Sequence, residues 1–557
     1  MTSCWLWTAI TRNSTICNRF KLTDMTKGQY YIGGAFLIGI AYRLLMGLQG
    51  IDSTNVGFCM TFYQNIFTHP DAIPNYFNYY LTGLLGGLWQ LAFGQYGLLG
   101  FRLLEALTLT AAIALIYAAF RPWLTSTRVT VVAILLSFLF PSSISTFHYN
   151  TLSFLLVTAS VYALIRWQRA GRYVWLVVAG LFIGVSFFAR FLNITLALLA
   201  IVPFVSGCHH SVKRGLANVG IYACGVLVGC LLVCGLMVTL GHWTYFVGAL
   251  TDSFHVFGND EVSYTPAGLF GIYMKGYVDI ALQIIAIVFI AWFYGDAGHL
   301  SKKLKIAARV VLLIGLFVLV FKSLPHLSAI AICTLLLVTT RRFVSVVFYP
   351  LLCAYLFPLG SDDGISATFL WCGGLLIIPA ACCYSRLISR WQRNIVSALC
   401  LTIGVLMVYR MGFKARGEEC LRTETTVVAI PGSLNVMTSP DRAKRYQNEV
   451  SRIRQYGEGN PLLLIANQAA ELYYATEKLP FTGSTQIATF TDDGLTKRLE
   501  QQYAYYQRLP LIVYIEQEKR TSGMEEFRRV LAPWMKRHGY QSVYKDGDLE
   551  IYKASCP

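Results

Sequence analysis

The stretch Gly50-Ile51-Asp52-Ser53-Thr54-Asn55-Val56-Gly57-Phe58 follows the first long apolar run and opens a segment, Asp52 to about Tyr96, that contains no Lys or Arg. Asp52 therefore stands at the mouth of a predicted membrane span. A carboxylate at this depth is costly unless it is solvated or paired, so it indicates a functional site. The alternative is a helix cap, because Asp followed by Ser, Thr and Asn is ordinary capping chemistry. Residue type alone leaves both interpretations open.

Composition places the chain among polytopic membrane proteins. Its 557 residues are 55% hydrophobic and only 13% charged, and many apolar runs reach the roughly 20 residues that cross a bilayer. The 15 cysteines are scattered without a Cys-x-x-Cys pair, so we expect no metal cluster. We predict about thirteen transmembrane helices, near residues 30–48, 97–120, 129–146, 150–166, 173–189, 191–206, 215–240, 276–295, 306–322, 326–340, 343–358, 364–384 and 393–410.

The distribution of charge predicts the orientation of these spans. A net charge of +17 would suggest a nucleic-acid partner in a soluble protein, but here most Lys and Arg lie in short loops between spans. With the amino terminus in the cytoplasm, the outer connections hold almost no positive residues beyond Arg190, Lys275 and Lys322. This asymmetry follows the positive-inside rule. It places the outer loop 50–96 and everything after Arg410 outside the cytoplasm.

Beyond Arg410 the hydrophobic spans stop and strand patterns alternate with helix patterns. Such alternation is typical of a small α/β domain, so we divide the chain into a transmembrane domain, 1–410, and an extracytoplasmic α/β domain, 411–557. Cys420 and Cys556 would be able to pair in that compartment. The predicted elements are strands at 425–430, 461–466 and 510–516, helices at 440–456, 492–507 and 522–538, and a hairpin from Tyr540 to Tyr552.

Polar and aromatic residues collect at the outer ends of the predicted spans, where they are candidates to line a substrate cavity. Each also has an ordinary structural interpretation: a core histidine, an interfacial tyrosine, a helix cap or a turn. Arg102 and Glu105, spaced i, i+3, are expected to pair on one helix face. The cavity candidates are His69, Asp71, Tyr79, Tyr80, His148, Tyr149, Asn150, Asp362 and Asp363.

Six short segments, taken in this order, carry a family resemblance. They are Asp52 after the first span, the aromatic stretch Asn75–Trp89, Gly100–Leu107, His148–Leu152, Ala189–Phe191 and the tail segment Ala470–Thr476. This arrangement resembles the integral-membrane GT-C glycosyltransferases, close to the bacterial branch of aminoarabinose transferases and protein mannosyltransferases. The resemblance covers most of the chain. The order of the predicted spans together with Asp52 is more specific than any one of the short motifs.

The resemblance implies a sugar donor carried on a polyprenyl phosphate and transfer on the outer face of the bacterial cytoplasmic membrane, with the tail in the periplasm. Asp52 would be the catalytic base toward a glycan, lipid or protein acceptor. Arg190, Arg43 and Lys322 would bind the donor phosphate, because cationic side chains pair with it. Many relatives have a second acid after the Asp, where this chain has Ser53. No cofactor is therefore certain, and a divalent metal remains an alternative.

Other functions fit parts of the pattern. A surface-polysaccharide ligase or polymerase would share the lipid-phosphate donor. It would be expected to rely on Arg and His in a long outer loop in the later part of the chain, and the 241–275 loop is only of modest length. A lipid-linked-glycan transporter would show internal repeats and charges near the bilayer midplane. Arg190 and Arg43 also have the positions of arginines that snorkel to the interface.

Overall fold

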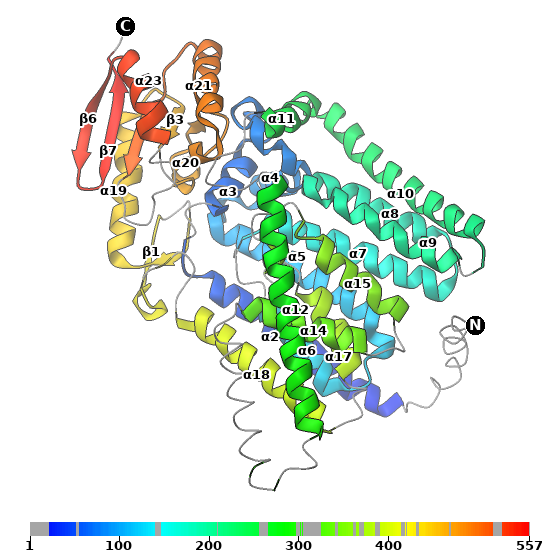
Figure 1. The fold of residues 1–557 in the computed structure, drawn as a ribbon. Helices are drawn as coiled ribbons and strands as arrows, with labels where there is room; N and C mark the ends of the chain where they lie inside the picture. The colour runs from blue at the N-terminus through cyan, green and yellow to red at the C-terminus, as the bar shows by residue number, and fades with distance from the viewer. Residues whose placement is uncertain are drawn as a thin grey trace.

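The structure is a computed structural model that describes residues 22–51, 55–139, 146–208, 210–255, 266–296, 301, 304, 325–339, 344–359, 364–366, 373–384, 390–413, 418, 420–430, 434–466, 469–515 and 526–555. Most of residues 22–413 are helical (Figure 1). The helices are α2 (Leu22–Gly47), α3 (Asn55–Asn65), α4 (Tyr80–Phe93), α5 (Gly97–Phe120), α6 (Thr127–Leu139), α7 (Tyr149–Ala170), α8 (Val174–Ala189), α9 (Ile201–Cys208), α10 (Val212–Thr239), α11 (Trp243–His255), α12 (Pro266–Asp296), α14 (Pro325–Thr339), α15 (Val344–Leu356), α17 (Gly374–Tyr384) and α18 (Arg390–Phe413), with 3-10 segments η2 (Pro70–Ala72), η3 (Pro74–Tyr79), η6 (Phe191–Ala200) and η9 (Gly364–Ser366).

Each predicted span that falls on described residues coincides with helix, and 97–120 has the bounds of α5. The span predicted at 306–322 lies outside the described residues. Within the described part of the chain, five helical segments are long and apolar enough to cross a membrane, so the chain is a multi-pass membrane protein. The total of thirteen spans stays a prediction. The five segments are Lys27–Gly47, Pro74–Trp123, Phe191–Cys208, Val212–Thr239 and Phe270–Phe289.

Helices α8 and α10 pack backbone against backbone. A Cβ added at Gly180 or Gly184 of α8 would overlap the backbone of α10, and one added at Gly225 or Gly229 would overlap the backbone of α8. Small residues four apart are the usual way for membrane helices to approach closely, because lipid supplies no hydrophobic drive for packing. This contact fixes the end of α8, at Ala189, and with it the start of η6.

The tail forms a five-stranded sheet in the order β4-β3-β5-β7-β6. Strand β3 is parallel to β4 and β5, and the hairpin β6–β7 joins antiparallel through β7. The predicted strands, the helix at 440–456 and the hairpin are confirmed, with ends that shift by a few residues. The elements are β1 (Val427–Val428), β2 (Met437–Thr438), α19 (Pro440–Tyr456), β3 (Leu462–Ile465), α20 (Glu471–Thr476), β4 (Leu479–Pro480), α21 (Asp492–Tyr506), β5 (Leu511–Ile515), η12 (Phe527–Leu531), α23 (Ala532–Arg537), β6 (Tyr540–Asp546) and β7 (Leu549–Ala554).

The two faces of this sheet pack against different parts of the molecule. Leu462 and Leu464 belong to a cluster with side chains of α21 and α23. Leu463 and Ile465, which point the other way because strand side chains alternate, belong to a second cluster that includes α19 and the outer loop. One hydrophobic core therefore continues from the sheet into the helices of residues 22–413.

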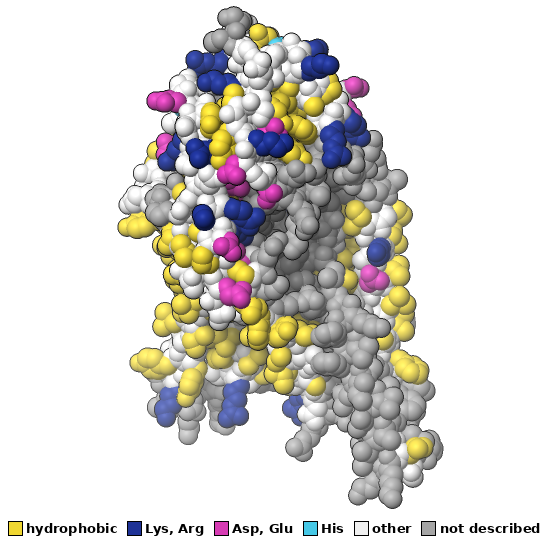
Figure 2. Space-filling model, turned by 90° about the vertical axis from the view of Figure 1, so that its left-hand side faces the viewer, with side chains coloured by type: hydrophobic (Ala, Val, Ile, Leu, Met, Phe, Trp, Pro, Cys, Tyr) yellow, Lys and Arg dark blue, Asp and Glu magenta, His cyan; other side chains and the backbone are white. Residues whose placement is uncertain are grey.

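The tail lies over the outer loop at one end of the helix bundle (Figure 1). Helix α3 approaches α20 so closely that a Cβ on Gly57 would overlap the backbone of Ala470 and Glu471. In Figure 2 charged side chains gather on the tail, a region rich in hydrophobic side chains lies below it, and Lys and Arg reappear at the opposite end. This distribution suits a bundle that crosses a bilayer with its basic end on one side.

Candidate active site

The start of α7 is fixed by His148. Its ring Nδ1 lies 3.1 Å from the backbone nitrogen of Thr151, which donates to it, and 2.8 Å from the Thr151 hydroxyl. The histidine thus caps the helix, whereas the sequence had suggested Asn150 as a cap and a structural role in the core for His148. The residue before it, Phe147, accepts a hydrogen bond at its carbonyl from the Tyr63 hydroxyl of α3, at 2.9 Å. The α7 start is therefore joined directly to the outer loop.

Aromatic rings make a second connection between the loop and α7. Tyr79 and Tyr149 stack with ring centroids 4.2 Å apart and planes inclined by 21°. Phe58 of α3 meets the Tyr79 ring edge-on at 5.9 Å. Both tyrosines are partly exposed, so their rings are accessible at the surface of the site. Stacked or exposed aromatic faces are a usual platform for the apolar face of a sugar ring.

Arg190 lies at the break between α8 and η6, where its backbone is extended. Its side chain is only 3% exposed. The guanidinium Nη1 donates to the Phe357 carbonyl at 3.0 Å and lies over the Phe357 ring at 5.5 Å. The neighbouring Ala189 carbonyl accepts from Thr82 of α4 at 3.0 Å. The outer loop, α7 and Arg190 are thus linked, since Thr82 follows Tyr79 by three residues.

Buried amides complete this locus. Asn193, one turn after Arg190, donates from Nδ2 to the Ser153 hydroxyl at 2.7 Å and to the Ser186 carbonyl at 2.9 Å. Asn150 lies one turn before Ser153 on α7 and is fully buried, and both its amide atoms are without a hydrogen-bond partner in the structure. A buried amide normally has partners, so its unmet donors and acceptor indicate a place for a polar ligand or water.

Arg43 is engaged with Glu105. Its Nη2 lies 2.7 Å from Glu105 Oε1, and both side chains are almost completely buried. Glu105 thus has its ion pair with Arg43, whereas the sequence spacing had suggested Arg102. The Arg102 guanidinium donates to backbone carbonyls of the segment after α2, including that of Gly50 at 2.5 Å. Arg102 thus holds the carbonyls of Gly47, Gln49 and Gly50, and sequence spacing gave no sign of these hydrogen bonds.

The other described candidates lie around the outer loop. Tyr80 packs with Phe77 and His242, and its hydroxyl is 3.4 Å from His242 Nδ1. His69 is exposed at the start of η2. Asp71 faces the tail: burial, together with the nearby Asp71 carboxylate, raises the pKa of the Tyr506 phenol. Tyr79, His148, Tyr149, Asn150 and Arg190 thus form the connected group, whereas Tyr80 packs against His242, His69 is exposed and Asp71 lies near the tail.

Asp52, Lys322, Asp362, Asp363 and Cys556 lie outside the described residues, so their proposed roles stay predictions. The chain on both sides of Asp52 is placed. Ile51 and Val56 are buried in the same hydrophobic cluster as Phe188 and Ala189, which immediately precede Arg190. Both flanks of Asp52 therefore pack into the core that also holds the end of α8.

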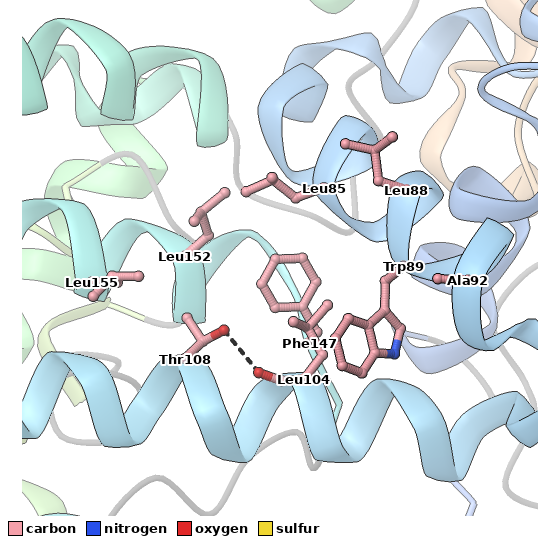
Figure 3. A pocket seen from close by; sticks show the side chains of 9 residues that line it. All are labelled: Leu85, Leu88, Trp89, Ala92, Leu104, Thr108, Phe147, Leu152 and Leu155. Carbon is pink, nitrogen blue, oxygen red and sulfur yellow. Dashed lines mark hydrogen bonds between the residues drawn. The ribbon is translucent and has the colours of Figure 1, made fainter.

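An apolar pocket opens beside this group (Figure 3). Its volume is about 310 Å³, at the lower end of the range for small-molecule sites. The Thr108 hydroxyl donates to the Leu104 carbonyl at 2.8 Å, so its hydrogen is not available to a ligand in the pocket. Phe147, next to His148, forms one wall. The lining residues are Leu85, Leu88, Trp89, Ala92, Leu104, Thr108, Phe147, Leu152 and Leu155.

Two features of the site were missed by sequence reasoning. Asn193 carried a weak signal, because it is a polar residue shortly after Arg190 in an otherwise apolar run. Arg442 of α19, which donates to the Ile51 carbonyl at 3.0 Å, carried none, because it is one of several basic residues on a charged tail helix. Among the residues that the structure describes, no three His, Cys, Asp or Glu side chains come together as metal ligands, and we assign none there.

Comparison with known families bears on this geometry. Residues 84–239 match the model of the dolichyl-phosphate-mannose-protein mannosyltransferases. The matched segment runs from within α4 to the end of α10 and contains Tyr149, Asn150 and Arg190. Over this segment, the match indicates a membrane glycosyltransferase of the GT-C type. The resemblance expected from the sequence is confirmed at this level.

The chain as a whole is also similar to a solved structure. The crystal structure of ArnT from Cupriavidus metallidurans in the apo state is 14% identical, with a TM-score of 0.41, and the match covers 95% of this chain and 98% of that chain. A likeness of this size carries no functional argument. A comparison with curated proteins gave no match.

Proposed function

We propose that this GT-C glycosyltransferase moves a sugar from a polyprenyl-phosphate donor to an acceptor hydroxyl on the outer face of the bacterial cytoplasmic membrane. The observation that carries the proposal is the group formed by Tyr79, Tyr149, Asn150 and Arg190. It combines an aromatic platform, a buried amide without partners and a buried guanidinium at the outer ends of α7 and α8. The matched family is described as using dolichyl-phosphate mannose.

Each group has a role in the proposed reaction. Asp52 accepts the proton of the acceptor hydroxyl as that oxygen forms a bond to the anomeric carbon. The bond from the anomeric carbon to the phosphate oxygen breaks, and polyprenyl phosphate leaves with its electron pair. Arg190 binds the phosphate and stabilises the added negative charge, because a guanidinium presents several donors to phosphate oxygens.

Two further features suit a lipid-linked sugar. Asn150 offers a donor and an acceptor in a dry environment, where a hydrogen bond to a sugar hydroxyl is strong. The apolar pocket between α4, α5 and α7 is lined almost wholly by hydrocarbon side chains, which suits part of an isoprenoid chain. We place the sugar between the tyrosines and Asn150, and the lipid in the pocket next to Phe147.

The test uses the full-length protein in lipid nanodiscs. It is incubated with decaprenyl-phosphate mannose, glucose and aminoarabinose, each with and without a membrane extract as the acceptor source, and release of decaprenyl phosphate is followed by mass spectrometry. We expect acceptor-dependent release from at least one donor. If no donor releases lipid phosphate while the protein remains folded and monodisperse, the proposed function is wrong.

A further inference from the structure

The five residues that lead from the first span to Asp52 are held by hydrogen bonds at every carbonyl. Arg102 of α5 donates to the carbonyls of Gly47, Gln49 and Gly50. The backbone nitrogen of Met437 donates to the Leu48 carbonyl at 2.8 Å. The Arg442 guanidinium donates from Nη2 to the Ile51 carbonyl at 3.0 Å. Two of these donors, Met437 and Arg442, belong to the tail.

The Ile51 carbonyl has a special place in this series. It belongs to the peptide group that joins Ile51 to Asp52. A peptide group is planar and rigid, so a donor fixed on its oxygen restricts the orientation of the next residue's backbone. Ile51 itself is fully buried, which anchors the other end of the same peptide.

Arg442 is itself held in one orientation by the tail. Its Nη1 lies 3.0 Å from Glu418 Oε1, whose oxygen also accepts from the Thr438 hydroxyl at 2.8 Å. Its Nη2 lies 3.2 Å from the Tyr446 hydroxyl, which donates to Glu471 at 2.7 Å. The Tyr446 ring lies 5.4 Å from the guanidinium carbon. A guanidinium with two occupied edges and a ring against its face has little rotational freedom.

We propose that Arg442 is a positioning residue, through which the tail domain holds the Ile51 carbonyl at the end of the segment that leads into Asp52. The tail then belongs to the catalytic site and is more than an appended domain. The catalytic part of this inference rests on the proposed function, in which Asp52 is the base. The physical part, that Arg442 holds the Ile51 end of the segment 47–51, stands without it.

Other contacts hold the tail to the membrane domain independently of Arg442. The Tyr76 hydroxyl donates to Thr485 at 2.7 Å, Arg498 pairs with Asp252, and Gly57 lies against the backbone of α20. The shared hydrophobic core adds to these contacts. Loss of the Arg442 side chain should therefore loosen the Ile51 end of the segment 47–51 without detaching the tail. A local effect near Ile51 would indicate a positioning role for Arg442, whereas a loss of order throughout the tail would indicate a general stabilising role.

The first test needs no sugar substrate. Hydrogen–deuterium exchange is measured on the full-length protein in nanodiscs for the wild type, Arg442→Gln and the control Arg445→Gln, which changes an exposed arginine on the same helix. We expect peptides that cover residues 47–51 to exchange about 10-fold faster in Arg442→Gln only, with β3 and β5 unchanged. Unchanged exchange at 47–51, or equal acceleration throughout the tail, overturns the proposal.

The second test uses the donor that supports release of decaprenyl phosphate. Misplacement of a catalytic group by about 1 Å costs on the order of 100-fold in rate, so we expect a fall of that order in kcat for Arg442→Gln, with the donor KM within about 2-fold. Arg442→Lys keeps the charge and one donor direction, and should recover part of kcat. A raised KM with unchanged kcat contradicts positioning. If no donor is turned over, the proposed function fails and the exchange measurement alone decides the role of Arg442.

Discussion

Tyr79 of the outer loop stacks on Tyr149 of α7 with their ring centroids 4.2 Å apart. This contact joins the loop that follows Asp52 to the helix that carries Asn150. It also explains why a loop of this length is ordered over the bundle: its aromatic residues are packed on one another and on α7, and the tail covers them.

The stack is testable by a double-mutant cycle. Such aromatic pairs contribute about 1 kcal/mol beyond the area they bury, so Tyr79→Leu and Tyr149→Leu should show a coupling free energy of about that size in denaturant unfolding. Tyr149→Phe keeps the ring and should behave as wild type in stability. Strictly additive effects of the two leucine substitutions would show that the rings do not interact in the folded protein.

The buried pair of Arg43 and Glu105 should be sensitive to loss of one partner. Glu105→Gln leaves the Arg43 guanidinium buried without its carboxylate, which costs roughly 3–5 kcal/mol in the free energy of unfolding. The double variant Arg43→Met, Glu105→Leu removes both charges and should regain most of that loss. The exposed Arg172→Gln serves as the control. A Glu105→Gln variant as stable as the control would contradict the paired geometry.

Close packing of α8 on α10 predicts opposite outcomes for two glycines of the same helix. A Cβ at Gly225 would overlap the Val177 backbone, whereas at Gly235 it would meet nothing within 4 Å. Gly225→Val should therefore lower the thermal transition by several degrees, since backbone overlap forces the helices apart. Gly235→Val should leave it nearly unchanged. Equal effects of the two substitutions would place the α8–α10 contact elsewhere.

His242 predicts a pH dependence of stability. Burial lowers its pKa, and a hydrogen bond to the Ile66 carbonyl only partly opposes this. In the unfolded chain, His242 has the ordinary histidine pKa of about 6.5. In the folded protein its pKa is lower, so it binds a proton only at lower pH. Stability is therefore full above that pH and is lost as the pH falls toward the lowered pKa.

The check is the melting temperature of the wild type and of His242→Phe between pH 7.5 and 5. The phenylalanine fits among the same aromatic neighbours, Phe67, Phe77 and Tyr80, and cannot titrate, so the acid loss should shrink. His69→Gln, at an exposed histidine, should retain the full acid loss. A His242→Phe variant with the same pH dependence as wild type would mean that another group causes it.

The sequence predicted those parts of the fold that local pattern controls. The span 97–120 and the tail helix 440–456 have the predicted bounds, because apolar length and amphipathic period are local properties. Tyr79, Tyr149 and Asn150 were candidates because they lie at the outer ends of spans. Their stacking, and the unmet amide of Asn150, depend on packing between helices and have no local signature.

Long-range polar contacts could not be predicted from spacing. Arg102 and Glu105 suit an i, i+3 pair, yet Glu105 has its ion pair with Arg43, 62 residues earlier, and Arg102 holds backbone carbonyls. These partners are buried, and a hydrogen bond between buried groups is stronger than one between exposed groups. The contact of Arg442 with Ile51 spans 391 residues, beyond the reach of any sequence period.

The central claim is that Asp52 and Arg190 serve one donor site with different roles, and the most direct measurement compares donor binding with turnover in two variants. For a donor that releases decaprenyl phosphate, Asp52→Asn should bind it with a Kd within about 2-fold of wild type while kcat falls by about 100-fold or more. Arg190→Gln should raise the Kd by about 10-fold or more, because a charge-assisted hydrogen bond to phosphate is lost. Wild-type kcat in Asp52→Asn together with wild-type Kd in Arg190→Gln would contradict the account.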